Sequence, residues 1–75
     1  MSRDPRFLDS ASDLGKAIRE ARQAAGLTLA VAAPSCGVSV KFLHALENGK
    51  STVQFDKAIS VARQLGLHVA LIERL

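Results

Sequence analysis

Glycine residues divide the apolar pattern of this chain into short segments. Gly26, Gly37 and Gly66 each follow a stretch in which apolar residues recur every three or four positions, and Asn48-Gly49 marks a turn between two such stretches. Apolar residues at that spacing form one face of a helix, and glycine readily ends a helix. The pattern therefore predicts a mainly α fold of four to five short helices that pack on one another.

The core of such a fold must be built from small aliphatic side chains. Hydrophobic residues make up 48% of the 75 residues, but aromatic residues make up only 4%. A single domain of this size is near the lower limit at which a core supports the fold unaided, and metals, disulfides or association usually help. Cys36 is the only cysteine, so no disulfide can form within the chain. We therefore expect one domain that self-associates.

The first two helices are predicted after an irregular arm, residues 1–9. Ser10 and Asp13 fit a capping box. The predicted inner face of the first helix is Leu14, Ala17, Ile18, Ala21 and Ala25. Thr28 is the predicted N-cap of the second helix, in which Pro34 removes a backbone donor and predicts a shortened or bent last turn. The inner face of this second helix is predicted to be Leu29, Ala32, Ala33 and Cys36.

Two further helices follow. Ser39 is the predicted cap of the third helix. Its inner side chains are predicted to be Leu43 and Leu46, together with Val38 from the turn, and its outer ones Val40, Lys41, His44 and, less clearly, Phe42. The predicted inner face of the fourth helix is Phe55, Ala58, Ile59, Ala62 and Leu65.

Beyond Gly66 the apolar period changes from three or four residues to two. Leu67, Val69 and Leu71 alternate with their neighbours, which predicts one strand over residues 67–73. A lone strand has unpaired backbone groups, so we expect it to pair antiparallel with the same strand of a second copy. The expected divisions are an arm (1–9), a helical domain (10–66) and a dimerisation strand (67–75).

The segments LGKAIREARQAAGLT, GVSVKFLHALENGKS and FDKAISVARQLGL resemble Xre-type, lambda-repressor-like helix-turn-helix domains over residues 10–66. The following LHVALIE is similar to the strand of the HipB-like antitoxin branch. The resemblance implies a homodimeric, sequence-specific repressor of its own operon, with a HipA-like kinase toxin as a partner. A stand-alone or phage-type repressor without a toxin, and an antitoxin acting mainly as a protein-interaction module, remain alternatives.

The resemblance also implies which residues bind DNA. In a helix-turn-helix unit the second helix enters the major groove, where lysine can donate to guanine and apolar side chains such as Val40 or Phe42 can contact a thymine methyl. In the following loop, backbone N–H groups and the Lys50 ammonium suit phosphates. The implied DNA-binding residues are Thr28, Ser39, Val40, Lys41, Phe42, His44, Asn48, Gly49, Lys50 and Ser51. Leu29 replaces a glutamine common in the family and is not among them.

Other residues receive structural predictions. Arg22 and Glu47 are expected to pair between the first and third helices, Cys36 to be buried and unreactive, and Phe42 to pack on the fourth helix or a partner in preference to a base. No enzyme motif, cofactor site or metal-ligand spacing is apparent, so we expect no catalysis.

The charge balance suits DNA as a partner. The net charge of +3 fits a polyanion. DNA binding requires Lys16, Arg19, Lys41 and Lys50 to converge, whereas scattered cations would favour a protein-interaction module. We expect a cytoplasmic, nucleoid-associated protein with no membrane segment.

Overall fold

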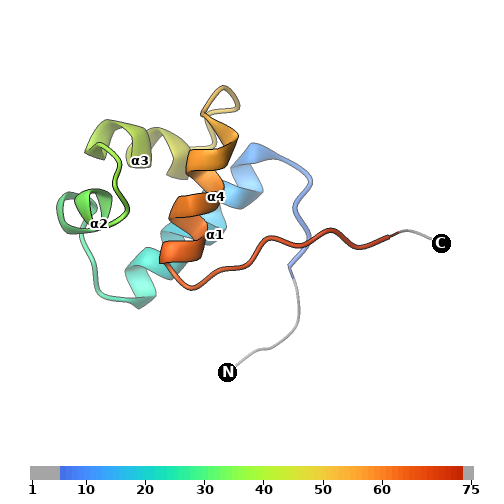
Figure 1. Ribbon diagram of the computed structural model, residues 1–75, viewed down its shortest axis with the longest axis horizontal. Coiled ribbons are helices and arrows are strands. Elements are labelled where there is room, and N and C mark those ends of the chain that lie inside the picture. The colour runs from blue at the N-terminus through green and yellow to red at the C-terminus, as the bar shows by residue number, and fades with distance from the viewer. Residues whose placement is uncertain (1–5, 74–75) are drawn as a thin grey trace.

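The computed structural model describes residues 6–73 and contains four helices in that range (Figure 1). These are α1 (Ala11–Ala24), α2 (Leu29–Ser35), α3 (Val40–Glu47) and α4 (Phe55–Gln64). The mainly α prediction is confirmed, with four helices. Residues 1–5 of the predicted arm and residues 74–75 of the predicted strand region lie outside the described residues.

The first three helices begin at their predicted caps. In each, the hydroxyl of the residue before the helix accepts a hydrogen bond from the backbone N–H three residues later, at 3.0–3.3 Å; the three caps are Ser10, Thr28 and Ser39. The capping box differs from the prediction, because the Asp13 carboxylate accepts from the N–H of Asp9, one residue before the cap. These caps fix the starts of the helices locally.

A sharp turn separates α2 from α3. The two helix axes differ by 107°, within the range of helix-turn-helix units. Gly37 lies in the turn with φ +72°, a backbone conformation that favours glycine. Helix α2 ends one residue after Pro34, in agreement with the predicted short last turn. Within residues 6–73, no single helix is long and apolar enough to cross a membrane.

The core consists of aliphatic side chains from all four helices. The largest fully buried side chains are Ile18, Leu43, Leu46 and Val61, and Ala32, Ala33, Ala58 and Ala62 fill the space between them. Two predicted inner positions are wrong, because Ala25 and Phe55 are exposed. Ala25 follows the last residue of α1, and Phe55 occupies the first turn of α4, where the inner face is set by Ala58, Val61 and Ala62.

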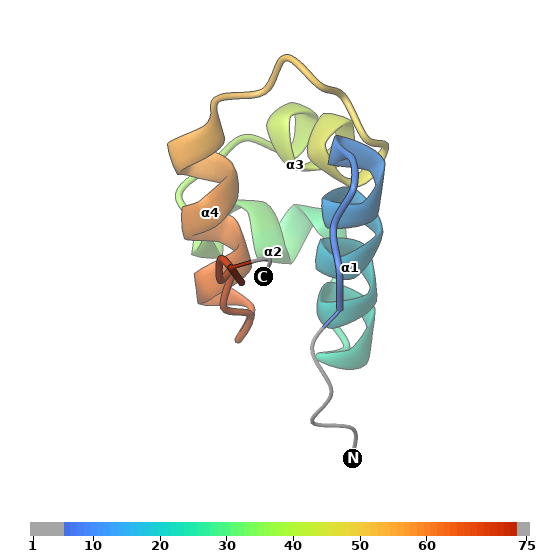
Figure 2. The ribbon, with the colours of Figure 1, turned by 90° about the vertical axis from the view of Figure 1, so that its right-hand side faces the viewer.

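Helices α1 and α4 stand apart, and α2 and α3 close one side of the space between them (Figure 2). Residues 6–9 run back along α1, where Arg6 forms an ion pair with Glu20 at 2.7 Å. Residues 67–73 leave α4 on the side away from α2 and α3 (Figure 1).

The predicted strand is absent from the described part of the chain. Residues 67–73 carry no regular secondary structure. A strand is defined by hydrogen bonds to a neighbour, and none is present here because a single copy contains no second strand. Leu67 nevertheless packs against the core, whereas Val69 is 42% exposed and Leu71 is fully exposed.

Candidate nucleic-acid interface

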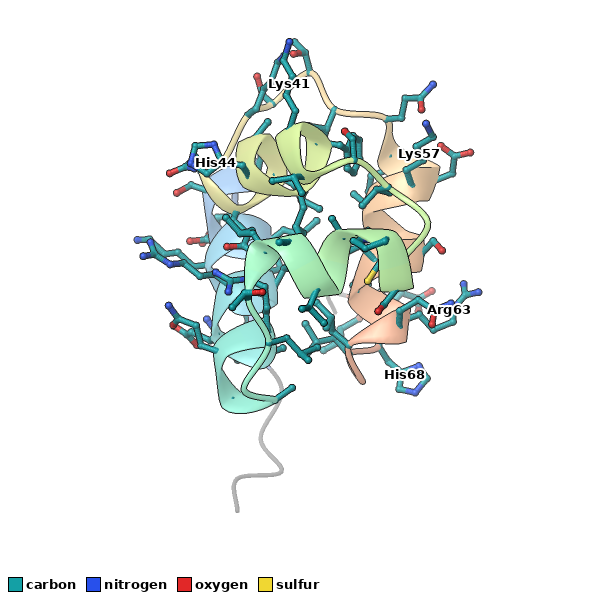
Figure 3. The ribbon with its side chains drawn as sticks, turned by 90° about the vertical axis from the view of Figure 1, so that its left-hand side faces the viewer. Lys41, His44, Lys57, Arg63 and His68 are labelled. Carbon is teal, nitrogen blue, oxygen red and sulfur yellow. The ribbon has the colours of Figure 1, made fainter. Side chains whose placement is uncertain are left out.

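The outer face of α3 presents the residues that the sequence assigned to base recognition. Leu43 and Leu46 are buried, which fixes the rotation of α3 about its axis. Val40, Lys41 and His44 are exposed as a result. Figure 3 shows Lys41 and His44 projecting from α3 away from the core. The helix therefore offers a cationic side chain and an imidazole to a partner.

The single carboxylate of α3 is turned inward. Glu47 accepts two hydrogen bonds from Arg22 of α1, at 2.7 Å from Nε and 2.9 Å from the second guanidinium nitrogen, and both residues are buried. Arg22 also donates to the carbonyl of Leu27 at 2.8 Å. The hydrogen bond to Glu47 raises the pKa of Arg22 above its ordinary value. The predicted pair is confirmed, and it keeps negative charge away from the outer face of α3.

Two glycines let α1 and the end of α3 approach closely. A Cβ at Gly15 would overlap the backbone carbonyl oxygen of Leu46 and lie 2.9 Å from that of Glu47. A Cβ at Gly49 would lie 2.9 Å from the Cα of Ser12. The packing role of Gly15 was not predicted from the sequence. Its signal was a glycine inside an otherwise helical pattern, which often marks close packing.

The turn after α3 is held by hydrogen bonds within the chain. The backbone N–H groups of Asn48, Gly49 and Lys50 donate to carbonyls of α3 at 3.0–3.1 Å, and the Asn48 side-chain amide donates to His44 at 2.7 Å. These N–H groups were expected to suit phosphates, but they already have partners. The exposed Lys50 ammonium is thus the cationic group that this turn presents.

A shallow concavity between α3 and the loop before α4 brings two of the predicted cations together. Lys41 lies on its α3 side and Lys50 on its loop side. The lining residues are Ser39, Lys41, Phe42, Ala45, Lys50, Thr52, Val53 and Gln54, none of them acidic. Of these, Ala45, Thr52, Val53 and Gln54 were not predicted. Ala45 could have been, because it lies one helical turn after Lys41 on the same face.

Phe42 forms one wall of this concavity. Its ring is half-buried and packs against the core, which agrees with the preference for packing over base contact. The Lys57 ammonium lies 5.8 Å from the ring centroid, at cation–π distance. Lys57 belongs to α4, so this contact links α4 to the wall of the concavity.

The remaining predicted positions lie outside the concavity. Thr28 caps α2, His44 projects from α3, and Ser51 is exposed in the loop. On α1, Lys16 and Arg19 are exposed, and neither lines the concavity. Two of the four cations, Lys41 and Lys50, therefore converge, and the expected convergence of all four is not observed.

The structure offers little for metal or thiol chemistry. Among residues 6–73 no group of three His, Cys, Asp or Glu side chains could hold a metal ion. Burial raises the pKa of the half-buried Cys36 thiol, which disfavours the reactive thiolate.

Comparison with known proteins identifies the family. A family model described as a helix-turn-helix domain matches residues 13–75. The chain belongs to the helix-turn-helix domain family. This match confirms the Xre-like class of the fold and supports a DNA-binding regulator. No curated protein matches the chain. The matched range includes α2, the turn and α3, and so includes the outer face of α3 that carries Lys41.

Proposed function

We propose that this helix-turn-helix domain is a sequence-specific transcriptional repressor that binds duplex DNA through the outer face of α3. The observation that carries the proposal is the pairing of Lys41 and Lys50 along one concavity without an acidic lining residue. A DNA groove presents base edges beside phosphates, so a base-reading cation and a phosphate-binding cation are required side by side.

In this proposal the DNA-facing residues divide by role. Lys41 donates to guanine O6 and N7, and Ser39, Val40 and His44 lie next to it at the groove. Lys50 and Ser51 face phosphates from the loop, and Thr28 does so from the start of α2. Asn48 and Gly49 shape the turn that presents Lys50, since their N–H groups are bonded to α3.

We also propose that two copies bind together through residues 67–73. Val69, Leu71 and Ile72 are exposed apolar side chains at the end of the described chain. Antiparallel pairing of this segment across a two-fold axis would satisfy its backbone groups. The segment lies away from α2 and α3 (Figure 1), so pairing would leave α3 free for DNA. Two α3 helices about 34 Å apart would then reach successive major grooves.

The resemblance to HipB-like antitoxins motivates a more specific proposal. In it, the dimer represses its own operon and also holds a HipA-like kinase toxin. Phe55, which is 71% exposed on α4, provides an apolar anchor for a protein partner. Co-purification with the product of a neighbouring kinase gene would support the antitoxin role. A chain that represses without such a neighbour would instead be a stand-alone repressor.

Substitution of the two lysines tests the DNA-binding proposal. Lys41→Ala should weaken binding to the preferred duplex more than to random duplex, by about 1–3 kcal/mol of discrimination. Lys50→Ala should weaken both and reduce the dependence on salt. Lys16→Ala, an exposed lysine outside the concavity, is the control. Competition titrations at fixed salt measure these effects, and equal losses on both duplexes for Lys41→Ala would remove this residue from base recognition.

A further inference from the structure

Most of the large apolar side chains that residues 6–73 leave exposed lie on the two terminal segments. On the helices, α2, α3 and α4 expose one each. The others belong to residues 6–9 and 67–73 and are Phe7, Leu8, Val69, Leu71 and Ile72. Figure 2 shows residues 6–9 in front of α1 and residues 67–73 beside the end of α4, on the face turned away from α2. The two segments therefore bring apolar side chains to one face of the molecule.

The arm, residues 6–9, is held on α1 by two polar contacts. The Asp13 carboxylate accepts a hydrogen bond from the N–H of Asp9 at 2.9 Å, and Arg6 pairs with Glu20 at 2.7 Å. Asp13 lies in the first turn of α1 and Glu20 about two turns further along. Followed from Asp9 to Arg6, the arm thus runs from the start of α1 toward its end.

This direction separates the arm from the candidate nucleic-acid interface. The turn after α3 meets the start of α1, where a Cβ at Gly49 would lie 2.9 Å from the Cα of Ser12. Lys50 follows Gly49 in that turn. Because the arm leads away from the start of α1, it leads away from Lys50. Phe7 is therefore exposed on a surface other than the one assigned to DNA.

A stable interface between two copies requires more surface than residues 67–73 provide. A specific interface commonly takes about 20–30 residues from each partner, whereas pairing of this segment alone uses seven residues. Further surface on the same face must therefore take part. The arm lies on that face and carries Phe7 and Leu8, which are 73% and 39% exposed.

We propose that the arm belongs to the interface between two copies of this chain, with Phe7 of one copy packed on residues 67–73 of the other. This inference rests on the proposed dimeric repressor and adds a second contact surface to its dimer. In pairing across a two-fold axis, each copy presents the same face to the other. The exposed Phe7 ring is then covered by the partner's Val69, Leu71 and Ile72, which are exposed in a single copy.

Phe7→Ser tests the arm in the full chain, and Phe55→Ser is the matched control. The two phenylalanines are 73% and 71% exposed, but Phe55 begins α4, whereas residues 67–73 follow its other end. Phe7→Ser should raise the dimer dissociation constant at least about ten-fold, as expected for the loss of one buried aromatic side chain. Phe55→Ser should leave it unchanged. Sedimentation velocity over a concentration series measures both constants, and circular dichroism checks that each variant folds. Equal weakening by the two substitutions would overturn the proposal.

Isotope-filtered NMR of a mixed dimer, with one labelled and one unlabelled copy, tests the contact itself. Nuclear Overhauser effects are expected between the Phe7 ring of one copy and the methyl groups of residues 69–72 of the other. Effects from Phe7 that arise only within one copy would contradict the proposed packing.

Titration with a duplex enriched from a randomised library separates a role in dimerisation from a contact with DNA. At protein concentrations at which both proteins are fully dimeric, Phe7→Ser should bind this duplex as tightly as the unsubstituted chain. A loss of affinity under these conditions, with an unchanged dimer dissociation constant, would assign the arm to DNA and overturn the proposal.

Failure of this inference differs from failure of the proposed dimer. Weaker association of Leu71→Ser together with unchanged association of Phe7→Ser would overturn the role of the arm and leave the dimer through residues 67–73 intact. An unsubstituted chain that stays monomeric throughout the concentration series would overturn both.

Discussion

Between α1 and α3 the chain supplies both partners of each contact, whereas beyond α4 it leaves apolar side chains uncovered. Arg22 and Glu47 neutralise one another in a buried site, and Gly15 lets two helix backbones touch. Leu71 and Ile72, by contrast, are 100% and 65% exposed. In the first region, the contacts are complete within one copy. In the second region, exposed apolar side chains are available to contact another molecule.

This contrast separates two kinds of contribution to the fold. Contacts between α1 and α3 fix the position of the outer face of α3. They should therefore control the free energy of unfolding directly and the affinity for DNA only indirectly. The apolar surface of residues 67–73 contributes little to one copy, so it should control association. The predictions below test the two regions separately.

The largest effect is expected for Glu47→Ala. Removing the carboxylate leaves Arg22 buried without its partner, which should lower the free energy of unfolding by about 3–5 kcal/mol. Glu20→Ala breaks the exposed pair with Arg6 and is the matched control, with an expected loss of about 0–1 kcal/mol. Thermal melts of Glu47→Ala, Arg22→Ala and the double variant give the coupling energy, and strictly additive losses would show that the pair is not coupled.

Gly15→Ala should be next in size. Its new methyl group would collide with backbone atoms of Leu46 and Glu47, which cannot rotate away as a side chain could. We expect the free energy of unfolding to fall by about 2–3 kcal/mol, even though alanine favours a helix over glycine by about 1 kcal/mol. Gly26→Ala, at φ +73° with nothing within 4 Å, isolates the backbone cost. Chemical denaturation that ranks Gly26→Ala as the more damaging would contradict close packing of α1 on α3.

The smallest effect on folding is expected in the second region. Leu71→Ser should change the free energy of unfolding of a single copy by less than about 0.5 kcal/mol, because the side chain is fully exposed. The fully buried Leu43 offers the matched comparison, and Leu43→Ala should lose about 2–5 kcal/mol. Sedimentation velocity should show weaker self-association for Leu71→Ser. An unfolding loss as large as that of Leu43→Ala would mean that residue 71 belongs to the core.

The sequence predicted the local determinants of the fold well. Ser10, Thr28 and Ser39 cap the helices as expected, because an N-cap is decided within four residues. The inner face of α4 was less predictable. Both Phe55 and Val61 fit a helical stripe, and which of them is buried depends on where α4 meets the other helices.

For the candidate site, prediction succeeded on the helix and was weaker on the loop. Periodicity placed Lys41 and His44 outside and Leu43 inside. The contribution of Val53 depends on how the loop folds back beside α3, which no local pattern specifies. The Asn48 and Gly49 N–H groups were assigned to phosphates because the turn motif does not reveal that they bond to α3.

The central claim is that α3 binds DNA in a dimer made by the C-terminal segment. The most direct test compares the full chain with a chain ending at His68, which retains the core contact of Leu67. Light scattering and titration with the preferred duplex should show a dimer with tight binding for the full chain, and a folded monomer with much weaker binding for the shortened one. A shortened chain that remains dimeric and binds as tightly would contradict the claim.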